Sequence, residues 1–121
     1  MAIQHVQGKK AEAIAFALLE QRGWTLLNQN WRCRFGELDL VLVKPGRLLV
    51  VEVKGRSSRG MDDFGVAATN RRKRRCLARS VSCWRMEHPQ FQNHLLQVVL
   101  ALVRLRSVKP LVQWKTMERL D

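Results

Sequence analysis

The feature of this sequence that most constrains its fold is a pair of apolar segments separated by a Pro-Gly dipeptide, with acidic residues set into both. The segments are residues 36–44, GELDLVLVK, and residues 47–56, RLLVVEVKGR. Their alternation and β-branched content predict two antiparallel strands joined by a tight turn. An apolar strand tolerates a carboxylate poorly unless its charge is compensated, so the acidic residues of this hairpin need a physical explanation.

The turn predicts the register of the two strands. If the chain closes symmetrically around Pro45-Gly46, Val43 pairs with Leu48, and Asp39 then lies directly opposite Glu52. Cross-strand partners bring their Cβ atoms to about 4.5–5.5 Å, where partly buried carboxylates repel each other strongly. Either one carboxyl group stays protonated or a divalent cation lies between the two.

The same register predicts Glu37 opposite Lys54, and Lys54 shares a face of its strand with Glu52. Lys54 can therefore offset part of the negative charge. Carboxylate oxygens suit Mg²⁺ or Mn²⁺ better than zinc, so one of these ions is the alternative to protonation. Strict alternation also groups three leucines on the other face of the first strand, where they would pack against a helix: Leu38, Leu40 and Leu42.

The charge balance indicates a polyanionic partner. The 121 residues fit one domain, residues 1–121, with a single core. Their 22 Lys and Arg residues against 10 Asp and Glu residues give a formal charge of +12. Nucleic acid is the first candidate partner and an acidic membrane surface is the second, whereas solubility alone is the alternative explanation.

We expect a cytoplasmic protein that does not enter a membrane. The N-terminal residues lack the features of a signal peptide, and the longest apolar run, residues 98–103, is too short to cross a bilayer. The three cysteines are odd in number and lack paired zinc-ligand spacing, which suits a reducing compartment. They are expected to be small buried or half-buried residues.

Residues 9–22 are predicted to form a helix with one apolar stripe at helical spacing. The stripe consists of Ala11, Ile14, Ala15, Leu18 and Leu19. Gly23 is positioned to cap the C-terminal end. Glu12 borders the stripe near the expected helix start, where it either interacts favourably with the helix dipole or has a functional role.

Residues 24–27 are predicted to form a short strand. The segment that follows the next polar run, residues 31–35 (WRCRF), mixes Arg32 and Arg34 with aromatic residues. Such a segment can contact phosphates while a ring stacks on a base. The favoured alternative is that the two aromatic rings cover the core.

Residues 70–86 are predicted to form a second helix, with Thr69 as its N-cap and with Leu77, Val81 and Trp84 facing inward. Its first half carries six cations within nine residues and no acid: Arg71, Arg72, Lys73, Arg74, Arg75 and Arg79. Charge runs often form solvated helix faces, but like charges at this spacing destabilise a helix. Phosphate binding would relieve the repulsion, which favours a nucleic-acid contact.

The remaining segments complete the expected architecture. Residues 57–65 are predicted to form a loop that either carries substrate contacts or is a plain connection. Residues 95–105 are ambiguous between helix and strand by periodicity, and their Val and Leu content favours a buried strand. A turn at residues 107–110 and a last strand at residues 111–114 follow.

In chain order, a helix with Glu12 is followed by GELDL at residues 36–40 and VEVKGR at residues 51–56. This combination resembles the PD-(D/E)xK (restriction-endonuclease-like) nuclease superfamily, and most closely its YraN-like bacterial family, which is similar to archaeal Holliday-junction resolvases. The resemblance covers residues 8–80, although Leu38 replaces the proline of the superfamily motif. It implies an α/β fold with a central mixed β-sheet flanked by α-helices, and metal-dependent phosphodiester cleavage.

The resemblance also implies roles for single residues. Asp39 and Glu52 would bind Mg²⁺ or Mn²⁺ together with the carbonyl of Val53, and Glu12 would assist from its helix. The residues implied in catalysis are Glu12, Glu37, Asp39, Glu52 and Lys54. Of these, Lys54 would orient the attacking water or stabilise charge on the phosphate, and Glu37 would be its partner. The basic residues expected to contact nucleic acid are Arg32, Arg34, Arg56, Arg71, Arg72, Lys73, Arg74, Arg75 and Arg79.

Three functions follow as hypotheses. The first is an Mg²⁺-dependent endonuclease acting on branched or structured DNA, working as a homodimer by analogy with resolvases, whose two active sites cut two strands. The second is a non-catalytic nucleic-acid-binding protein with the same fold. The third, which the motif does not require, is a protein-interaction subunit or membrane-surface binder. The apolar run at residues 98–103 is either a dimer interface or part of the core.

Overall fold

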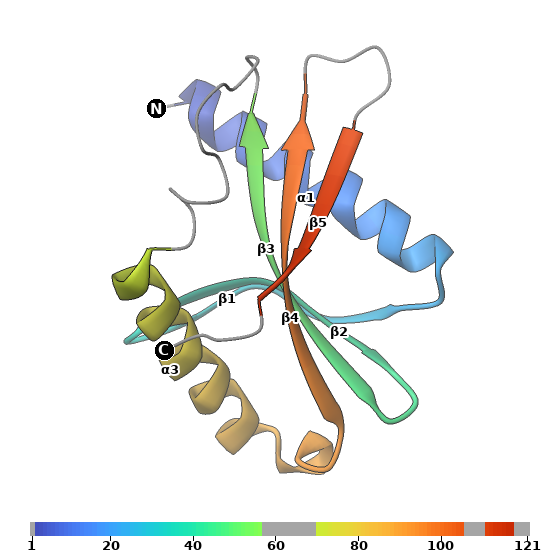
Figure 1. The fold of residues 1–121 in the computed structure, drawn as a ribbon, viewed down its shortest axis with the longest axis vertical. Helices are drawn as coiled ribbons and strands as arrows, with labels where there is room; N and C mark the ends of the chain where they lie inside the picture. The colour runs from blue at the N-terminus through green and yellow to red at the C-terminus, as the bar shows by residue number, and fades with distance from the viewer. Residues whose placement is uncertain (1, 57–69, 106–110, 118–121) are drawn as a thin grey trace.

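The structure is a computed structural model that describes residues 2–56, 70–105 and 111–117. Within these residues the helical elements are α1 (Ala2–Gln21), α3 (Arg71–Glu87) and the short 3-10 helix η1 (Pro89–Phe91). The strands are β1 (Thr25–Cys33), β2 (Gly36–Lys44), β3 (Arg47–Arg56), β4 (Leu95–Arg104) and β5 (Leu111–Thr116). They form one sheet in the order β1-β2-β3-β4-β5, shown in Figure 1.

The sheet is mixed and lies between the two helices. The β3–β4 pair is parallel and the other pairs are antiparallel. Leu40, Leu42 and Leu49 pack with α1 in one core cluster, whereas Val41 and Val50 pack with α3 in a second cluster. The predicted α/β class, a central mixed sheet flanked by helices, is therefore confirmed, and the arrangement is compatible with a restriction-endonuclease-like fold.

The β2–β3 hairpin has the predicted register at its turn, where Val43 pairs with Leu48. The ladder ends at the pair Leu40–Val51. Beyond it, β2 remains paired only with β1, and β3 remains paired only with β4. The two strands diverge at this point, so that the sheet splits into two arms (Figure 1). We call this point the sheet split.

The split changes which residues face each other. The predicted pair of Glu37 and Lys54 is wrong, because both residues lie beyond the end of the ladder. The expected grouping of three leucines is also wrong at Leu38, which packs in the α3-side cluster while Leu40 packs in the α1-side cluster. A two-stranded ribbon twists more strongly than a broad sheet, and β2 leaves β3 between these residues.

Helix α1 is longer than predicted, because it begins at Ala2 rather than at residue 9. Glu12 therefore lies in the middle of the helix, and the helix-dipole explanation for it is wrong. Gly23 caps the helix as expected, with φ of 93°. Its N–H donates to Glu20 O at 3.0 Å and the Trp24 N–H donates to Leu19 O at 3.1 Å, which is the Schellman arrangement.

Strand β1 is a single strand through Cys33, whereas a short strand ending at residue 27 was expected. The polar residues in its middle are accommodated by a register shift between Leu26 and Asn28 and by Asn30, which adopts φ of 54°. Trp31 is partly buried against the α3-side cluster, in agreement with the expected core role.

Helix α3 matches the prediction closely except at its cap. Asn70 rather than Thr69 is the N-cap, and its side chain accepts a hydrogen bond from the Lys73 N–H. Its inward-facing residues are those predicted: Leu77, Val81 and Trp84. The last of these donates its indole N–H to Asn28 Oδ1 at 2.7 Å, which links the helix to β1.

The predicted strand at residues 95–105 is confirmed as β4, and residues 98–103 are buried within the sheet. This run therefore belongs to the core, and its alternative interpretation as a dimer interface is wrong. The loop predicted at residues 57–65 and the turn predicted at residues 107–110 lie outside the described residues. In the described part of the chain, neither helix is long and apolar enough to cross a membrane.

Candidate functional site

The candidate site lies at the sheet split, where the two strands provide Asp39 and Glu52. The N–H of Val53 donates to Asp39 Oδ2 at 2.8 Å. The Asp39 side chain therefore accepts a hydrogen bond that a backbone carbonyl of β2 would accept if the ladder continued. Because the N–H and C=O of one strand residue point to the same side, the Val53 carbonyl also faces β2. The split thus gathers two carboxyl groups and one backbone carbonyl.

Glu52 carries the largest electrostatic perturbation of the site. Its carboxyl group contacts both the carboxyl group and the backbone N–H of Asp39, and its buried Oε2 has no hydrogen-bond partner. Burial, followed by the negative charge of Asp39, raises the pKa of Glu52 to about 9, although Lys54 acts in the opposite direction. Without a cation, Glu52 is therefore protonated at neutral pH.

Burial is also the largest effect on Asp39, whose pKa is raised to about 6. The hydrogen bond from the Val53 N–H and the charge of Lys54 oppose this rise, while Glu12 and Glu37 add to it. In the absence of a cation, the raised pKa of Glu52 therefore favours the first of the two solutions that the sequence left open, in which one member keeps its proton. Its negative surroundings are also favourable for a cation.

Glu12 is held next to the site by two amides from β1. Asn30 Nδ2 donates to Glu12 Oε1 at 2.8 Å, and Gln29 Nε2 donates to the same oxygen at 3.4 Å. Sequence reasoning assigned no role to Asn30, whose left-handed backbone brings its side chain to α1. The available signal was weak: asparagine is among the few non-glycine residues that accept this conformation.

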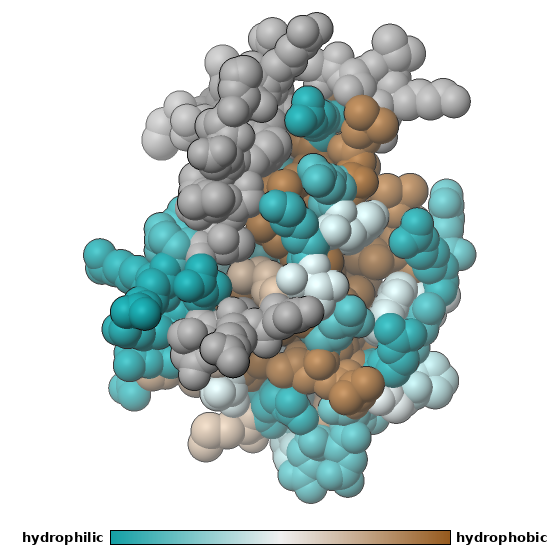
Figure 2. All heavy atoms as spheres, viewed as in Figure 1, coloured by the Kyte–Doolittle hydropathy of each residue, from teal (hydrophilic) through white to brown (hydrophobic). Residues whose placement is uncertain are grey.

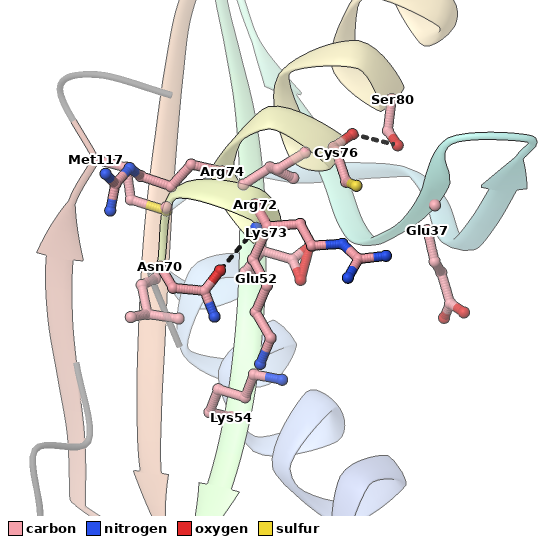
Figure 3. Close-up of a pocket in the computed structure, with 13 residues that line it drawn as sticks. Glu37, Glu52, Lys54, Asn70, Arg72, Lys73, Arg74, Cys76, Ser80 and Met117 are labelled. Carbon is pink, nitrogen blue, oxygen red and sulfur yellow. Dashed lines mark hydrogen bonds between the residues drawn. The ribbon is translucent and has the colours of Figure 1, made fainter. Parts of the chain in front are cut away.

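Glu37 is not part of the carboxyl pair. It forms an ion pair with Arg32 across β1 and β2, with a Nε–Oε2 distance of 3.2 Å. Figure 3 shows its carboxylate to one side, away from Lys54. The predicted partnership with Lys54 is therefore wrong in this structure, and the influence of Glu37 on Asp39 is a longer-range charge effect.

A cavity of about 480 Å³ lies beside the carboxyl pair. Glu52 and Lys54 form part of its wall, and the first turns of α3 lie over it (Figure 3). Its apolar wall includes Leu77, Leu100 and Met117. Asp39 is not one of the lining residues, so Glu52 is the carboxyl group of the pair that the cavity reaches.

The basic residues predicted to contact nucleic acid separate into several groups. Those at the cavity are Arg72, Lys73 and Arg74, next to the N-cap Asn70, which sequence reasoning missed. Arg71 and Arg75 are exposed elsewhere on α3. Hydrophilic side chains accordingly gather over the first half of α3 in Figure 2.

A further pair of arginines surrounds an aromatic ring at the β1–β2 turn. The guanidinium carbons of Arg34 and Arg79 lie 4.8 and 5.7 Å from the centre of the Phe35 ring. Arg32 is engaged by its acidic partner, and the side chain of Arg56 lies outside the description. The predicted basic residues are therefore divided in space between the cavity, the Phe35 ring and the remaining exposed surface of α3.

The donor atoms at the split fit a hard divalent cation. Among residues 2–56, 70–105 and 111–117, no three His, Cys, Asp or Glu side chains are close enough to hold a metal by themselves. The split instead offers two carboxyl groups and the Val53 carbonyl, all oxygen donors. Mg²⁺ is commonly bound by one or two carboxylates while waters and substrate phosphates complete its shell, so this donor set suits Mg²⁺ or Mn²⁺.

Fold and site together define an α/β protein whose mixed sheet opens around a half-buried carboxyl pair. Comparison with known proteins gives the family. Residues 11–107 match the model of "Uncharacterised protein family UPF0102", and the chain belongs to this family. It is 53% identical over 121 residues to the UPF0102 protein of Synechococcus sp. (strain CC9902), with both chains fully covered.

Two further relatives show how far the similarity extends. The UPF0102 protein of Prochlorococcus marinus (strain MIT 9303) is 48% identical over 115 residues, which are 95% of this chain and 91% of the relative. That of Neisseria meningitidis (strain FAM18) is 46% identical over 68 residues, which are 56% of each chain. The predicted YraN-like assignment is thereby confirmed at the level of the family.

Proposed function

We propose that this protein is an Mg²⁺- or Mn²⁺-dependent endonuclease of the PD-(D/E)xK superfamily that hydrolyses phosphodiester bonds in branched or otherwise structured DNA. The observation that carries the proposal is the Asp39–Glu52 pair. Two half-buried carboxyl groups interact, and Glu52 keeps a buried oxygen without a hydrogen-bond partner beside a cavity with a cationic rim. Such a pair opposes folding unless it is neutralised, and a cation would neutralise it.

The residues around the split would divide the work. Asp39, Glu52 and the Val53 carbonyl would hold the cation, and Glu12 would support Asp39 from α1. When bound, the cation would supply a Lewis acid for the phosphate and lower the pKa of water. Lys54 shares the cavity wall with Glu52, where its ammonium group would stabilise negative charge developing on the phosphate.

The cavity rim would position the nucleic acid. Arg72 and Lys73 lie at the cavity and are exposed, so they can contact phosphates without losing an internal partner. Arg75 continues the basic surface along α3. The preference for DNA and the homodimer are proposals that rest on the resemblance to resolvases, whose two active sites cut two strands.

Cleavage assays test this function directly. The protein is incubated with four-way junction, single-stranded and duplex DNA in Mg²⁺, in Mn²⁺ or in excess chelator. We expect metal-dependent cutting that falls by at least about 100-fold in Asp39→Asn, Glu52→Gln and Lys54→Met. Lys44→Met is the matched control, because Lys44 pairs with Arg47 at the turn end of the same hairpin, away from the split. Cutting that survives all three site variants would contradict the proposal.

A non-catalytic nucleic-acid-binding protein is the second candidate. It is favoured by Arg71 and Arg75, which are exposed on α3 but do not line the cavity, and by the absence of a three-side-chain metal cluster in the described ranges. Binding of DNA that weakens steeply with salt, with no cutting of any substrate, would support it. Removing one phosphate contact, as in Arg72→Ala or Arg75→Ala, should lower the salt slope by about one. Arg22→Ala, an exposed arginine near α1, is the control.

A further inference from the structure

Two cysteines from distant parts of the sequence meet where the β1–β2 turn packs against α3. Cys33 is the last residue of β1, and Cys83 lies in the second half of α3. The Cys33 thiol donates to Ser80 Oγ at 3.6 Å, and the two thiols lie near enough for each to shift the pKa of the other. Both cysteines are free thiols and half-buried. The contact therefore joins two elements 50 residues apart in sequence.

The backbone around this contact fixes the close approach. Gly36 has φ of 151°, and a Cβ at this position would lie 3.2 Å from Ser80 Oγ. A side chain here would strain the turn or displace α3. Ser80 and Cys83 are three residues apart, so they lie on the same side of the helix. The turn consequently holds Cys33 against that side of α3.

The two thiols differ in acidity. Partial burial acts to raise the pKa of Cys33, but hydrogen bonds with its neighbours outweigh burial and lower this pKa below its usual value. These neighbours are Ser80, the backbone N–H groups of Phe35 and Gly36, and Cys83. Partial burial and the adjacent Cys33 sulfur raise the pKa of Cys83. An acidic, accessible thiol beside a second thiol is typical of sites where one attacks an oxidant and the other resolves the product.

We propose that Cys33 and Cys83 form a peroxide-sensitive dithiol site that closes reversibly into an intramolecular disulfide. The Cys33 thiolate attacks hydrogen peroxide, and the O–O bond breaks to give a sulfenic acid and, after protonation, one water. The Cys83 thiol then attacks the oxidised sulfur, so that the S–S bond forms and a second water leaves. The two thiols lose two electrons and two hydrogens to the peroxide, and a dithiol reductant reverses the step by exchange.

The disulfide would couple oxidation to the cavity of the candidate site. Gly36 and Glu37 follow Cys33 closely and line the cavity from the β1–β2 side, while Ser80 lines it from α3. A covalent bond between Cys33 and Cys83 would fix these two walls relative to each other. The inference needs only thiol chemistry, so it stands whether or not the protein is a nuclease.

Thiol mapping on the full-length protein tests the proposal, with Cys76 as an internal control because it is the exposed cysteine on the same helix. Reduced protein is treated with hydrogen peroxide, quenched with N-ethylmaleimide and analysed by intact and peptide mass spectrometry. We expect two of the three thiols to be lost in a monomer lighter by two hydrogens, with a peptide linking Cys33 to Cys83. Dithiothreitol should restore all three thiols.

Single variants separate the two roles. Cys76→Ser should form the same disulfide, whereas Cys83→Ser should stop at a Cys33 sulfenic acid that dimedone traps. If Cys33→Ser does not fold, peptide mapping of the wild type and the Cys83→Ser result still decide the question. Oxidation of Cys76 before the other two thiols, a disulfide that includes Cys76, or a covalent dimer as the main product would overturn the proposal.

Discussion

The two ends of the β2–β3 hairpin differ in their effect on stability, although they are built from the same two strands. At the turn end the ladder is closed from Lys44–Arg47 to Leu40–Val51, and its side chains fill both core clusters. At the open end the ladder stops, a carboxylate accepts the next backbone N–H, and two half-buried acidic groups lie together. The closed end therefore stabilises an open end that opposes folding, which is the pattern expected of a binding site.

The largest expected effect lies at the closed end. Leu42→Ala should lower the free energy of unfolding by about 2–5 kcal/mol, because Leu42 is fully buried in the α1-side cluster and its truncation leaves a cavity. Urea denaturation measures the change. Leu111→Ala is the control, since Leu111 is 58% exposed and should change stability by less than about 0.5 kcal/mol. Equal losses in both variants would contradict this assignment of the core.

At the open end, a substitution should raise the free energy of unfolding rather than lower it. Glu52→Gln keeps the shape of the side chain and removes the ionisable group, so we expect the metal-free protein to gain about 1–3 kcal/mol of stability near pH 8. Thermal or urea unfolding gives the difference. Glu20→Gln is the matched control on the exposed side of α1 and should change little. Destabilisation by Glu52→Gln across the whole pH range would show that its charge is not the source of cost.

The pH dependence follows from the same raised pKa. The folded protein keeps the Glu52 proton up to about pH 9, whereas the unfolded chain releases it near its ordinary value of 4.5. The stability that the folded protein gains by holding the Glu52 proton is therefore fully present below about pH 4.5 and is lost as pH rises through about 9. Stability of the wild type relative to Glu52→Gln should fall across this window, which paired unfolding curves at several pH values would measure.

A smaller effect is expected at Asn30, which ties β1 to Glu12. Asn30→Ala loses the hydrogen bond to Glu12 at 2.8 Å, and it places alanine at φ of 54°, a left-handed conformation that alanine disfavours. We expect the free energy of unfolding to fall by about 1–2 kcal/mol. Asn30→Gly should lose less, because glycine accepts this backbone. If Asn30→Gly were the more destabilised variant in urea, backbone strain would not contribute here.

Much of the architecture follows from local sequence signals. The Pro45-Gly46 turn set the register as far as Leu40–Val51, and the apolar spacing of α3 identified its inner face. The α1 start was missed because residues 2–8 (AIQHVQG) mix apolar and polar residues and include Gly8, so the regular apolar stripe begins only later.

The site was harder to predict than the fold. Asp39 and Glu52 were predicted as a facing pair from the register of the Pro45-Gly46 turn, but nothing in their neighbours indicates that the ladder stops beside them. The split is a tertiary feature, since β3 continues with β4. Because of the split, Glu37 does not lie opposite Lys54, and it forms an ion pair with Arg32 instead. The amides of Gln29 and Asn30 that hold Glu12 were missed because β1 was predicted to end at residue 27, before these residues.

The most direct test of the central claim, that the sheet split is a divalent-cation site, is calorimetric titration of the wild-type protein with Mn²⁺ in buffers of different ionisation enthalpy near pH 7.5. We predict binding that releases a proton, because the protonated Glu52 must ionise to bind the metal. Asp39→Asn and Glu52→Gln should each weaken it by about tenfold or more, while Glu20→Gln should not. Mn²⁺ binding that releases no proton and is unchanged in both site variants, or no binding at all, would contradict the account.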